Sequence, residues 1–327
     1  MNYEQFVADF TAELQQNMEQ ENVELRRGTF RKVNEELDGI SIKYPDSPVA
    51  PTIYLDDKYQ MVEDGSYTVE QVAERTAMQL KSIREDAPEV PLLTEESARQ
   101  NLYCVVINAA ENEEMLRNVP HERLEDLAVI PRFKVREDAS FIVSNDLCSN
   151  LKMTSEEVME AAHANTNKQE FECQNMTEVM RGIMKEQGMP DEYVDELLRM
   201  QGQDCPMYVM SNESRVEGAV ALISTSAMES AYEKIKEDHP DMENLYVLGS
   251  SRHELILIPD DAVDNVEDLK AIHKEVQDTE LSQADKLTEN IYKFDAQTKQ
   301  LSIADAPELT ESASEVMEVV KSHGRSH

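Results

Sequence analysis

Short apolar runs of β type lie close together in this chain, separated by only a few polar residues. The clearest pair flanks Ser250–Glu254 in the stretch LYVLGSSRHELILIPDD, and a second pair turns at Asp295–Lys299 in IYKFDAQTKQLSIAD. Connections this short join antiparallel neighbours, because parallel strands need a crossover of a dozen residues or more. We therefore expect an α+β fold built mainly on antiparallel sheets, with helices packed against them.

Amphipathic periodicity predicts helices between these runs. In residues 3–16, Phe6, Val7, Phe10 and Leu14 recur at helical spacing, which places them on one face of a helix. Further helices are expected at residues 69–83, 155–164, 227–236 and 266–276, and at residues 178–200 with a break at GMPDE. Further strands are expected at residues 23–33, 39–44 and 52–55 and in the runs YCVVINA, DLAVIPRFKV and SFIVS. MYVMSN and GAVALIS are expected to form a hairpin that turns at residues 213–217. The segment EDAPEVPLLTEES is expected to be a connector.

Two segments share one order of features. TIYLDD followed by YTVEQVAER corresponds to SFIVSND followed by MTSEEVMEA, each a strand, a loop and a helix that begins after a threonine. Gln71 follows Thr68 by three positions and Glu157 follows Thr154 by three, which is the spacing of a capping box. A diverged internal duplication of a strand-loop-helix unit is one hypothesis. The alternative is that unrelated strand-loop-helix units share this pattern.

The length of 327 residues allows one large domain or two ordinary ones, at about 150 residues per domain. The segment GMPDE marks the divide that we predict, because Gly188 and Pro190 end one helix and Asp191 is placed to cap the next. The expected parts are an N-terminal α+β lobe at residues 1–175, a helical connector at 176–204, a C-terminal α+β lobe at 205–305 and a loosely ordered acidic tail at 306–327.

A large surplus of acidic residues limits the partners that the chain can bind. Lys and Arg number 31 and Asp and Glu number 67, which gives a formal net charge of −36. Such a surface repels phosphate backbones and anionic lipids, so we expect no direct nucleic-acid contact and no membrane contact. A protein partner with a basic surface is the partner class that remains. The start MNYEQFVADF carries acids where a signal peptide carries bases, and we expect a cytoplasmic protein.

The polar residues between the two strands, Ser250 to Glu254, are the candidate site. Alternate side chains of a strand point to opposite faces, so Ser251 can meet His253 and lies apart from Glu254. On the other face, Arg252 can meet Glu254. A serine beside a histidine is typical of hydrolases, although no G-x-S-x-G elbow accompanies this pair. The candidate catalytic residues are Ser251 and His253, and the candidate binding residues are Asn212, Ser250, Arg252 and Glu254.

A structural role is the alternative for the same residues. In that case the segment is a β-turn whose serine hydroxyls bond backbone amides, and the histidine at the start of the strand has a structural role.

Ligand patterns for metals and cofactors are missing from the sequence. HELIL carries Leu257 where the second histidine of H-E-x-x-H would stand, and IPDDAVDN lacks the order of a calcium loop. The four cysteines, Cys104, Cys148, Cys173 and Cys205, form no C-x-x-C, so we expect buried or half-buried free thiols. The chain has no P-loop and no G-x-G-x-x-G. We therefore expect no metal and no cofactor.

Several blocks of the chain occur in an order that resembles a bacterial family. The blocks are PTIYLDDKY, NLYCVVINAAENEEMLRNVPHERLEDLAVIPRF, MYVMSN with GAVALI, LYVLGSSRHELILIP and LTENIYKFDAQTKQL. Over about residues 6–303 they resemble an uncharacterised domain-of-unknown-function family found in multiple copies in gut clostridia. The resemblance implies a bacterial, cytoplasmic setting and no assigned activity. At this position the family usually reads LPSSxHE. Here Gly249 stands in place of the proline, so we expect a more flexible turn before the serines.

Three classes of function remain after these exclusions. The one we favour is a non-enzymatic interaction or regulatory protein whose acidic surface selects a basic partner. The second is an enzyme of unrecognised type with a cleft near the Ser-Ser-Arg-His-Glu turn. The third is an acidic nucleic-acid mimic, whose carboxylates stand in for phosphates. Charge alone does not separate the first class from the third.

Overall fold

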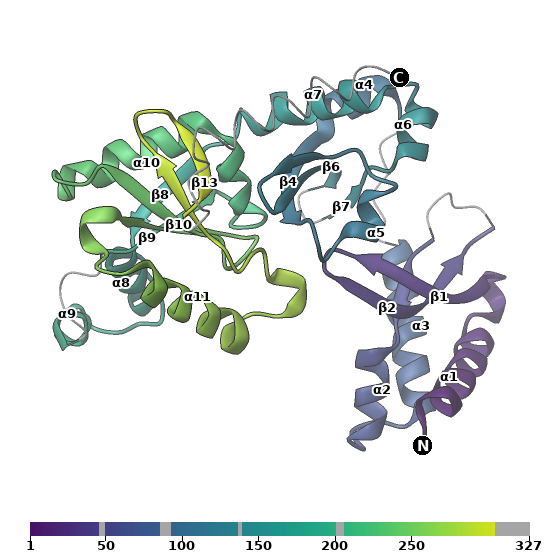
Figure 1. Cartoon of the computed structure of the whole chain (residues 1–327). Helices are drawn as coiled ribbons and strands as arrows, with labels where there is room; N and C mark the ends of the chain where they lie inside the picture. Colours follow the sequence, from purple (N-terminus) through teal and green to yellow (C-terminus); the bar gives the residue numbers. More distant parts are fainter. Residues whose placement is uncertain (46–49, 86–92, 137–138, 201–205, 305–327) are drawn as a thin grey trace. The chain divides into compact units, whose positions relative to one another are not determined.

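The structure is a computed structural model that describes residues 1–45, 50–85, 93–136, 139–200 and 206–304 (Figure 1). The chain forms two compact units: residues 1–121 with 130–165 make the first, and residues 122–129 with 166 onward make the second. The described part of the segment expected to be a connector at residues 176–204, which ends at residue 200, belongs to the second unit. The expected acidic tail at 306–327 lies outside the described residues.

The first half of the first unit is a small antiparallel sheet with helices packed on it. Its elements are α1 (Tyr3–Asn17), η1 (Glu19–Glu21), β1 (Glu24–Lys32), β2 (Glu35–Lys43), β3 (Thr52–Tyr54), α2 (Asp56–Glu63) and α3 (Val69–Glu85), with strand order β1-β2-β3. The apolar face predicted for the first helix is buried: Phe6, Phe10 and Leu14 have no exposed surface and share one core with Ile40 of β2 and Leu80 of α3. Burial of this face explains why α1 is helical in the fold.

The second half of the first unit repeats this order. Its elements are α4 (Glu95–Asn101), β4 (Leu102–Asn108), α5 (Glu113–Leu116), β6 (Leu127–Arg136), β7 (Ala139–Ile142), α6 (Asn145–Leu151) and α7 (Ser155–Thr166), and β6 lies between β4 and β7 in the sheet. β5 (Glu122–Leu124) and the first three residues of β6 belong to the second unit, and β5 pairs there with the start of β6. Apart from η1, α5 and β5, the two halves therefore share one order: a helix, three strands with the second in the middle, a short helix and a longer helix.

Both long helices begin with the predicted capping box. The Thr68 hydroxyl accepts from the amide of Gln71 at 3.3 Å, and the Gln71 side chain accepts from the amide of Thr68 at 3.0 Å. Thr154 and Glu157 make the same two bonds at 3.1 and 2.8 Å. These bonds satisfy amides that the first turn of a helix leaves free. The shared order of elements and caps supports the hypothesis of an internal duplication, which stays a prediction.

The second unit is a six-stranded antiparallel sheet covered by helices. Its elements are β8 (Phe171–Asn175), α8 (Met176–Glu186), α9 (Asp191–Met200), β9 (Tyr208–Asn212), η2 (Gly218–Ile223), α10 (Thr225–Asp238), β10 (Asn244–Leu248), β11 (Leu255–Pro259), η3 (Asp260–Ala262), α11 (Val266–Glu280), η4 (Gln283–Asp285), β12 (Ile291–Asp295) and β13 (Gln300–Ile303). The strand order is β13-β12-β10-β11-β9-β8. α10 lies on one face of this sheet, and α8 and α11 lie on the other (Figure 1). The predicted α+β class with antiparallel sheets is confirmed.

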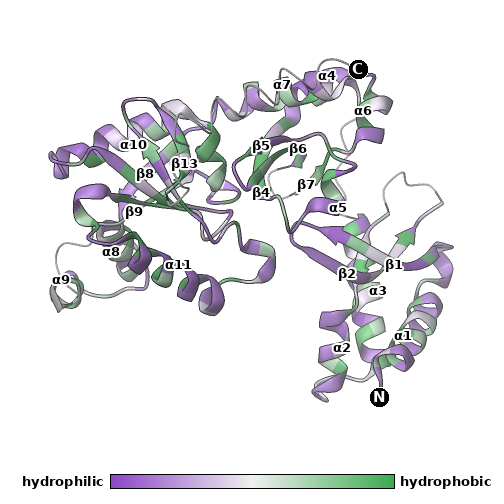
Figure 2. Cartoon of the chain, in the orientation of Figure 1, coloured by the Kyte–Doolittle hydropathy of each residue, from purple (hydrophilic) through white to green (hydrophobic). Residues whose placement is uncertain are grey.

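Alternation along the central strands assigns side chains to the two faces of the sheet. Tyr208 and Met210 of β9 and Leu255 and Leu257 of β11 are buried and lie in register with one another. The residues between them point to the opposite face, where Ile256 packs against the core formed with α11. The helix ribbons alternate between hydrophilic and hydrophobic residues, as expected when one side of each helix packs on a sheet (Figure 2).

Residues 122–129 join the second unit through Asp126. Its carboxylate accepts hydrogen bonds from the hydroxyls of Tyr292 and Thr288. Tyr292 is fully buried, and burial together with Asp126 raises the pKa of its hydroxyl. The pair of bonds thus links the β5–β6 turn to β12.

Two kinds of element were mispredicted. GAVALIS was expected to be a strand, but residues 218–223 form the 3₁₀ helix η2, and Gly218 to Leu222 are buried. A short apolar run fits a buried strand and a buried helix equally well, and packing decides between them. The helices α2, α4 and α6 and the strand β8 were not expected at all, since each is short and mostly polar. Asp191 is the first residue of α9, not the residue before it.

Candidate functional site

The Ser250–Glu254 turn joins β10 to β11 and is bonded to two distant segments. On one side, the carbonyls of Gly249 and Ser250 accept from the amides of Thr288 and Leu287, at 3.1 and 3.0 Å. The amide of Arg252 donates to the carbonyl of Asp285 at 2.9 Å. On the other side, the carbonyls of residues 252 and 253 accept from the first two amides of η2, at 3.1 and 3.0 Å. The backbone of the turn is therefore held on both sides.

Ser251 is buried in the turn, with 3% of its surface exposed. Its hydroxyl oxygen accepts from the amide of His253 at 3.0 Å. This is the bond that a turn serine makes with the backbone two residues later. Ser250, the neighbouring candidate, contributes its carbonyl, which also accepts from the side-chain amide of Gln277 at 3.2 Å.

Both ring nitrogens of His253 are engaged. The backbone amide of Glu217 lies 3.2 Å from Nδ1, and an amide can only donate, so Nδ1 carries no proton. In the neutral ring the proton is then on Nε2, which donates to Oδ1 of Asp285 at 3.0 Å. Burial opposes the charge on Asp285, yet hydrogen bonds from Ser282 and His253 hold the pKa of this carboxyl below its usual value. The imidazole therefore bridges η2 and η4.

Arg252 reaches the same two acidic residues as His253. Its Nη1 lies 3.1 Å from Oε1 of Glu217, and its Nε lies 3.8 Å from Oδ1 of Asp285. The side chain of Glu217 is only 10% exposed, and its backbone is left-handed, with φ of 57°. Arg252 thus pairs with residues far along the chain, and within the described residues it makes no bond to Glu254.

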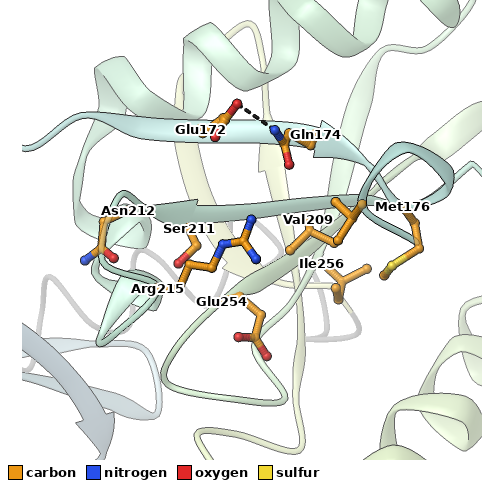
Figure 3. Close-up of a pocket in the computed structure, with 10 residues that line it drawn as sticks. Glu172, Gln174, Met176, Val209, Ser211, Asn212, Arg215, Glu254 and Ile256 are labelled. Atoms are coloured by element: carbon orange, nitrogen blue, oxygen red, sulfur yellow. Dashed lines mark hydrogen bonds between the residues drawn. The ribbon is translucent and has the colours of Figure 1, made fainter. Parts of the chain in front are cut away.

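A hollow of about 270 Å³ opens on the sheet face opposite α10 (Figure 3). It is lined by Glu172 and Gln174 of β8, Met176 and Val179 of α8, Val209, Ser211 and Asn212 of β9, Arg215 of the following loop, and Glu254 and Ile256 of β11. Two of the predicted binding residues, Asn212 and Glu254, line it. Ser251, His253, Ser250 and Arg252 do not.

The register of three strands arranges the lining in two rows. Gln174, Val209 and Ile256 lie side by side across β8, β9 and β11. In the next row Glu172 is opposite Ser211, and Glu254 is on the other side of Ser211, because Leu255 is opposite Met210. One row of the floor is therefore apolar at Val209 and Ile256, with the amide of Gln174 at its end, and the other row carries two carboxylates.

The loop after β9 brings one cation to the hollow. Asn212 shapes this loop: its side-chain amide donates to the carbonyl of Val216 at 2.9 Å, and its Oδ1 accepts from Ser214 at 3.0 Å. Arg215, in left-handed conformation with φ of 53°, extends its guanidinium past Ser211 toward Val209 (Figure 3). Within the part of the chain that the structure describes, this guanidinium has no ion pair.

The sequence matches a family of unknown function, DUF5688, over residues 3–296. The chain belongs to this family. It matches no curated protein and no solved structure. The match confirms the predicted resemblance of this DUF5688 protein to a family without assigned activity. The expected distribution of the family among gut clostridia stays a prediction.

Most residues that line the hollow of this DUF5688 protein were not predicted from the sequence. Glu172 and Gln174 alternate with buried Cys173 in FECQN, and this alternation is the one local signal for a half-buried strand. Arg215 lies in a loop without a motif. Since the strands that form the floor are distant in sequence, only their pairing brings the two carboxylates into one row.

The cysteines are buried thiols where the structure describes them. Cys104, Cys148 and Cys173 are buried thiols outside disulfides, as expected, whereas Cys205 lies outside the described residues. Burial raises the pKa of Cys173 to about 11, although Lys234 acts in the opposite direction. A thiol with a raised pKa is a poor nucleophile.

Two further features are absent from the described residues. No three side chains of His, Cys, Asp or Glu are gathered there in a way that could hold a metal ion. None of the helices described is both long and apolar enough to cross a membrane.

Proposed function

We propose that this DUF5688 protein is a non-enzymatic, cytoplasmic interaction or regulatory protein that binds a protein partner through a basic surface of that partner. The observation that carries the proposal is the bonding of His253. A general base needs a free nitrogen within reach of the proton it takes. Here Nδ1 accepts from Glu217 and Nε2 donates to Asp285, at 3.2 and 3.0 Å, while the Ser251 hydroxyl accepts from an amide.

Charge supports binding of a basic partner. A net charge of −36 attracts cationic surfaces over about one Debye length, which is ~8 Å in physiological salt. Complementary charge speeds encounter and suppresses wrong partners more than it adds affinity. Specific binding therefore needs a shaped site as well as the acidic surface.

The proposal is tested with synthetic peptides and the full chain. A fluorescent peptide of lysine, leucine and alanine is titrated with the protein, and a peptide with glutamate in place of lysine is the control. We expect the lysine peptide alone to bind, more weakly in 0.2 M than in 0.05 M salt. Equal binding of both peptides, or binding of neither, would overturn the proposal.

A further inference from the structure

We propose that the hollow on β8, β9 and β11 is the place where the basic partner docks. Its occupant is a partner segment in which a lysine or arginine is flanked by apolar residues. The inference rests on the proposed function and adds the binding site and the chemistry of the partner to it.

The size of the hollow suits one long side chain. Pockets for small molecules and cofactors measure roughly 300–1,000 Å³. The hollow, at about 270 Å³, lies below this range and is partly open to solvent. A single side chain of a protein partner fills such a space while the rest of the partner stays on the surface.

The two rows of the floor match the two parts of a lysine or arginine side chain. Val209 and Ile256 lie side by side in neighbouring strands and offer an apolar surface to the aliphatic stem. In the next row, Glu172 and Glu254 flank Ser211 on strands that are two spacings apart, roughly 10 Å. A stem over the first row places its cationic group within reach of these carboxylates.

Apolar surface continues from the hollow along α8. Met176 and Val179 line the hollow, and further along the helix Met180 and Met184 are half-buried. Ile183 is 46% exposed. Methionine-rich surfaces adapt their shape to a partner, and this one is placed to receive the apolar residues beside the bound cation.

Arg215 already brings a cation to this floor. Its guanidinium extends over the row of Val209 and makes no ion pair with any residue that the structure describes (Figure 3). The positive charge of Arg215 repels a second cation that approaches Glu172 and Glu254. Removal of this side chain strengthens binding, whereas removal of the carboxylate charges weakens it.

The experiment uses the full chain and the fluorescent lysine, leucine and alanine peptide. Glu172→Gln with Glu254→Gln removes two charges from the hollow, and the glutamine at 172 can still accept from Gln174, which now bonds Glu172 at 2.6 Å. The matched control is Glu233→Gln with Glu237→Gln on α10, which removes two exposed charges from the other face of the sheet. Thermal unfolding verifies that each variant is folded.

We expect the dissociation constant of the peptide to rise about tenfold when Glu172 and Glu254 are replaced, because two partly exposed ion pairs with the peptide are lost. It should rise less than about twofold when Glu233 and Glu237 of α10 are replaced. Arg215→Ala lowers it about twofold to threefold, while Lys58→Ala on α2 changes it less. Equal weakening by both glutamine pairs overturns the docking site and leaves the proposed function standing. Absence of binding by the wild-type protein overturns the proposed function itself.

Discussion

Among the glycines that the structure describes, Gly218 is the one where an added methyl group has the least room. A Cβ built on this glycine lies 2.1 Å from Oγ of Ser211 and 2.4 Å from the carbonyl oxygen of His253. Ordinary contact begins at 3.4 Å, so Gly218→Ala forces this carbonyl to move by about 1 Å. The serine hydroxyl can rotate away, but the carbonyl belongs to the backbone of the turn.

The cost follows from the hydrogen bonds that the moved backbone makes. The carbonyl of His253 accepts from the amide of Gly218 at 3.0 Å and from the hydroxyl of Ser211 at 2.7 Å. The carbonyl of Arg252 accepts from the amide of Ala219 at 3.1 Å. Three bonds at about 1 kcal/mol each predict that Gly218→Ala lowers the free energy of unfolding by about 3 kcal/mol.

Urea denaturation followed by circular dichroism measures this loss. Gly182→Ala is the matched control, because Gly182 lies inside α8 and a methyl group added there would have nothing within 4 Å. That variant should be more stable by about 0.5–1 kcal/mol, since alanine favours a helix. Ser211→Ala combined with Gly218→Ala removes the contact with the hydroxyl together with the hydroxyl's own bond to the carbonyl of His253, so it should recover less than half of the loss. A Gly218→Ala variant within about 0.5 kcal/mol of wild type would refute the reasoning.

Three further outcomes are expected. His253→Ala should lower the free energy of unfolding by about 2 kcal/mol, because it leaves the Glu217 amide without its partner and removes one of the hydrogen bonds to Asp285. Glu254→Ala, on the hollow, should change the free energy of unfolding by less than about 0.5 kcal/mol. Equal effects of the two substitutions would contradict the bridging role of His253. The pKa of Asp285 is lowered in the fold, so this carboxyl stabilises the protein above its unfolded pKa of about 3.9 and loses that effect as pH falls through the folded value. Between pH 6 and pH 2, the urea midpoint of Asp285→Asn should therefore fall less steeply than that of the wild type. Parallel curves for the two proteins would argue against the lowered pKa. The net charge of −36 makes the folded chain repel itself, and salt screens this repulsion as the Debye length falls from ~30 Å at 0.01 M to ~10 Å at 0.1 M. The melting temperature should therefore rise over this range of salt, and a flat curve would mean that the acidic side chains are already paired.

Features that depend on neighbouring residues could be predicted from the sequence. The helix at residues 3–17, the hairpin of β12 and β13, and the capping boxes of Thr68 and Thr154 follow from spacing within a few positions. Each is stabilised by contacts between residues that are close in the chain, such as a side-chain oxygen and an amide three positions away. Local pattern and final structure agree there because the same few residues decide both.

The local pattern also predicted which side chains of β11 share a face. Leu255 and Leu257 are fully buried, and Ile256 points to the opposite face of the sheet. A strand has a side-chain period of two wherever it lies, so this alternation needs no knowledge of its neighbours.

The sequence by itself thus determined the α+β class, the surplus of negative charge, the local helices and hairpins, and membership of the family. Only the tertiary structure decided what the Ser-Ser-Arg-His-Glu turn contacts and where the hollow lies. Asp285 is 32 positions from His253, and Glu217 is 36 positions before it. Glu172 and Glu254 enter one row because β8, β9 and β11 pair in one register. Such contacts arise when distant strands bury their apolar faces together, and the free energy of that packing is not contained in any short segment.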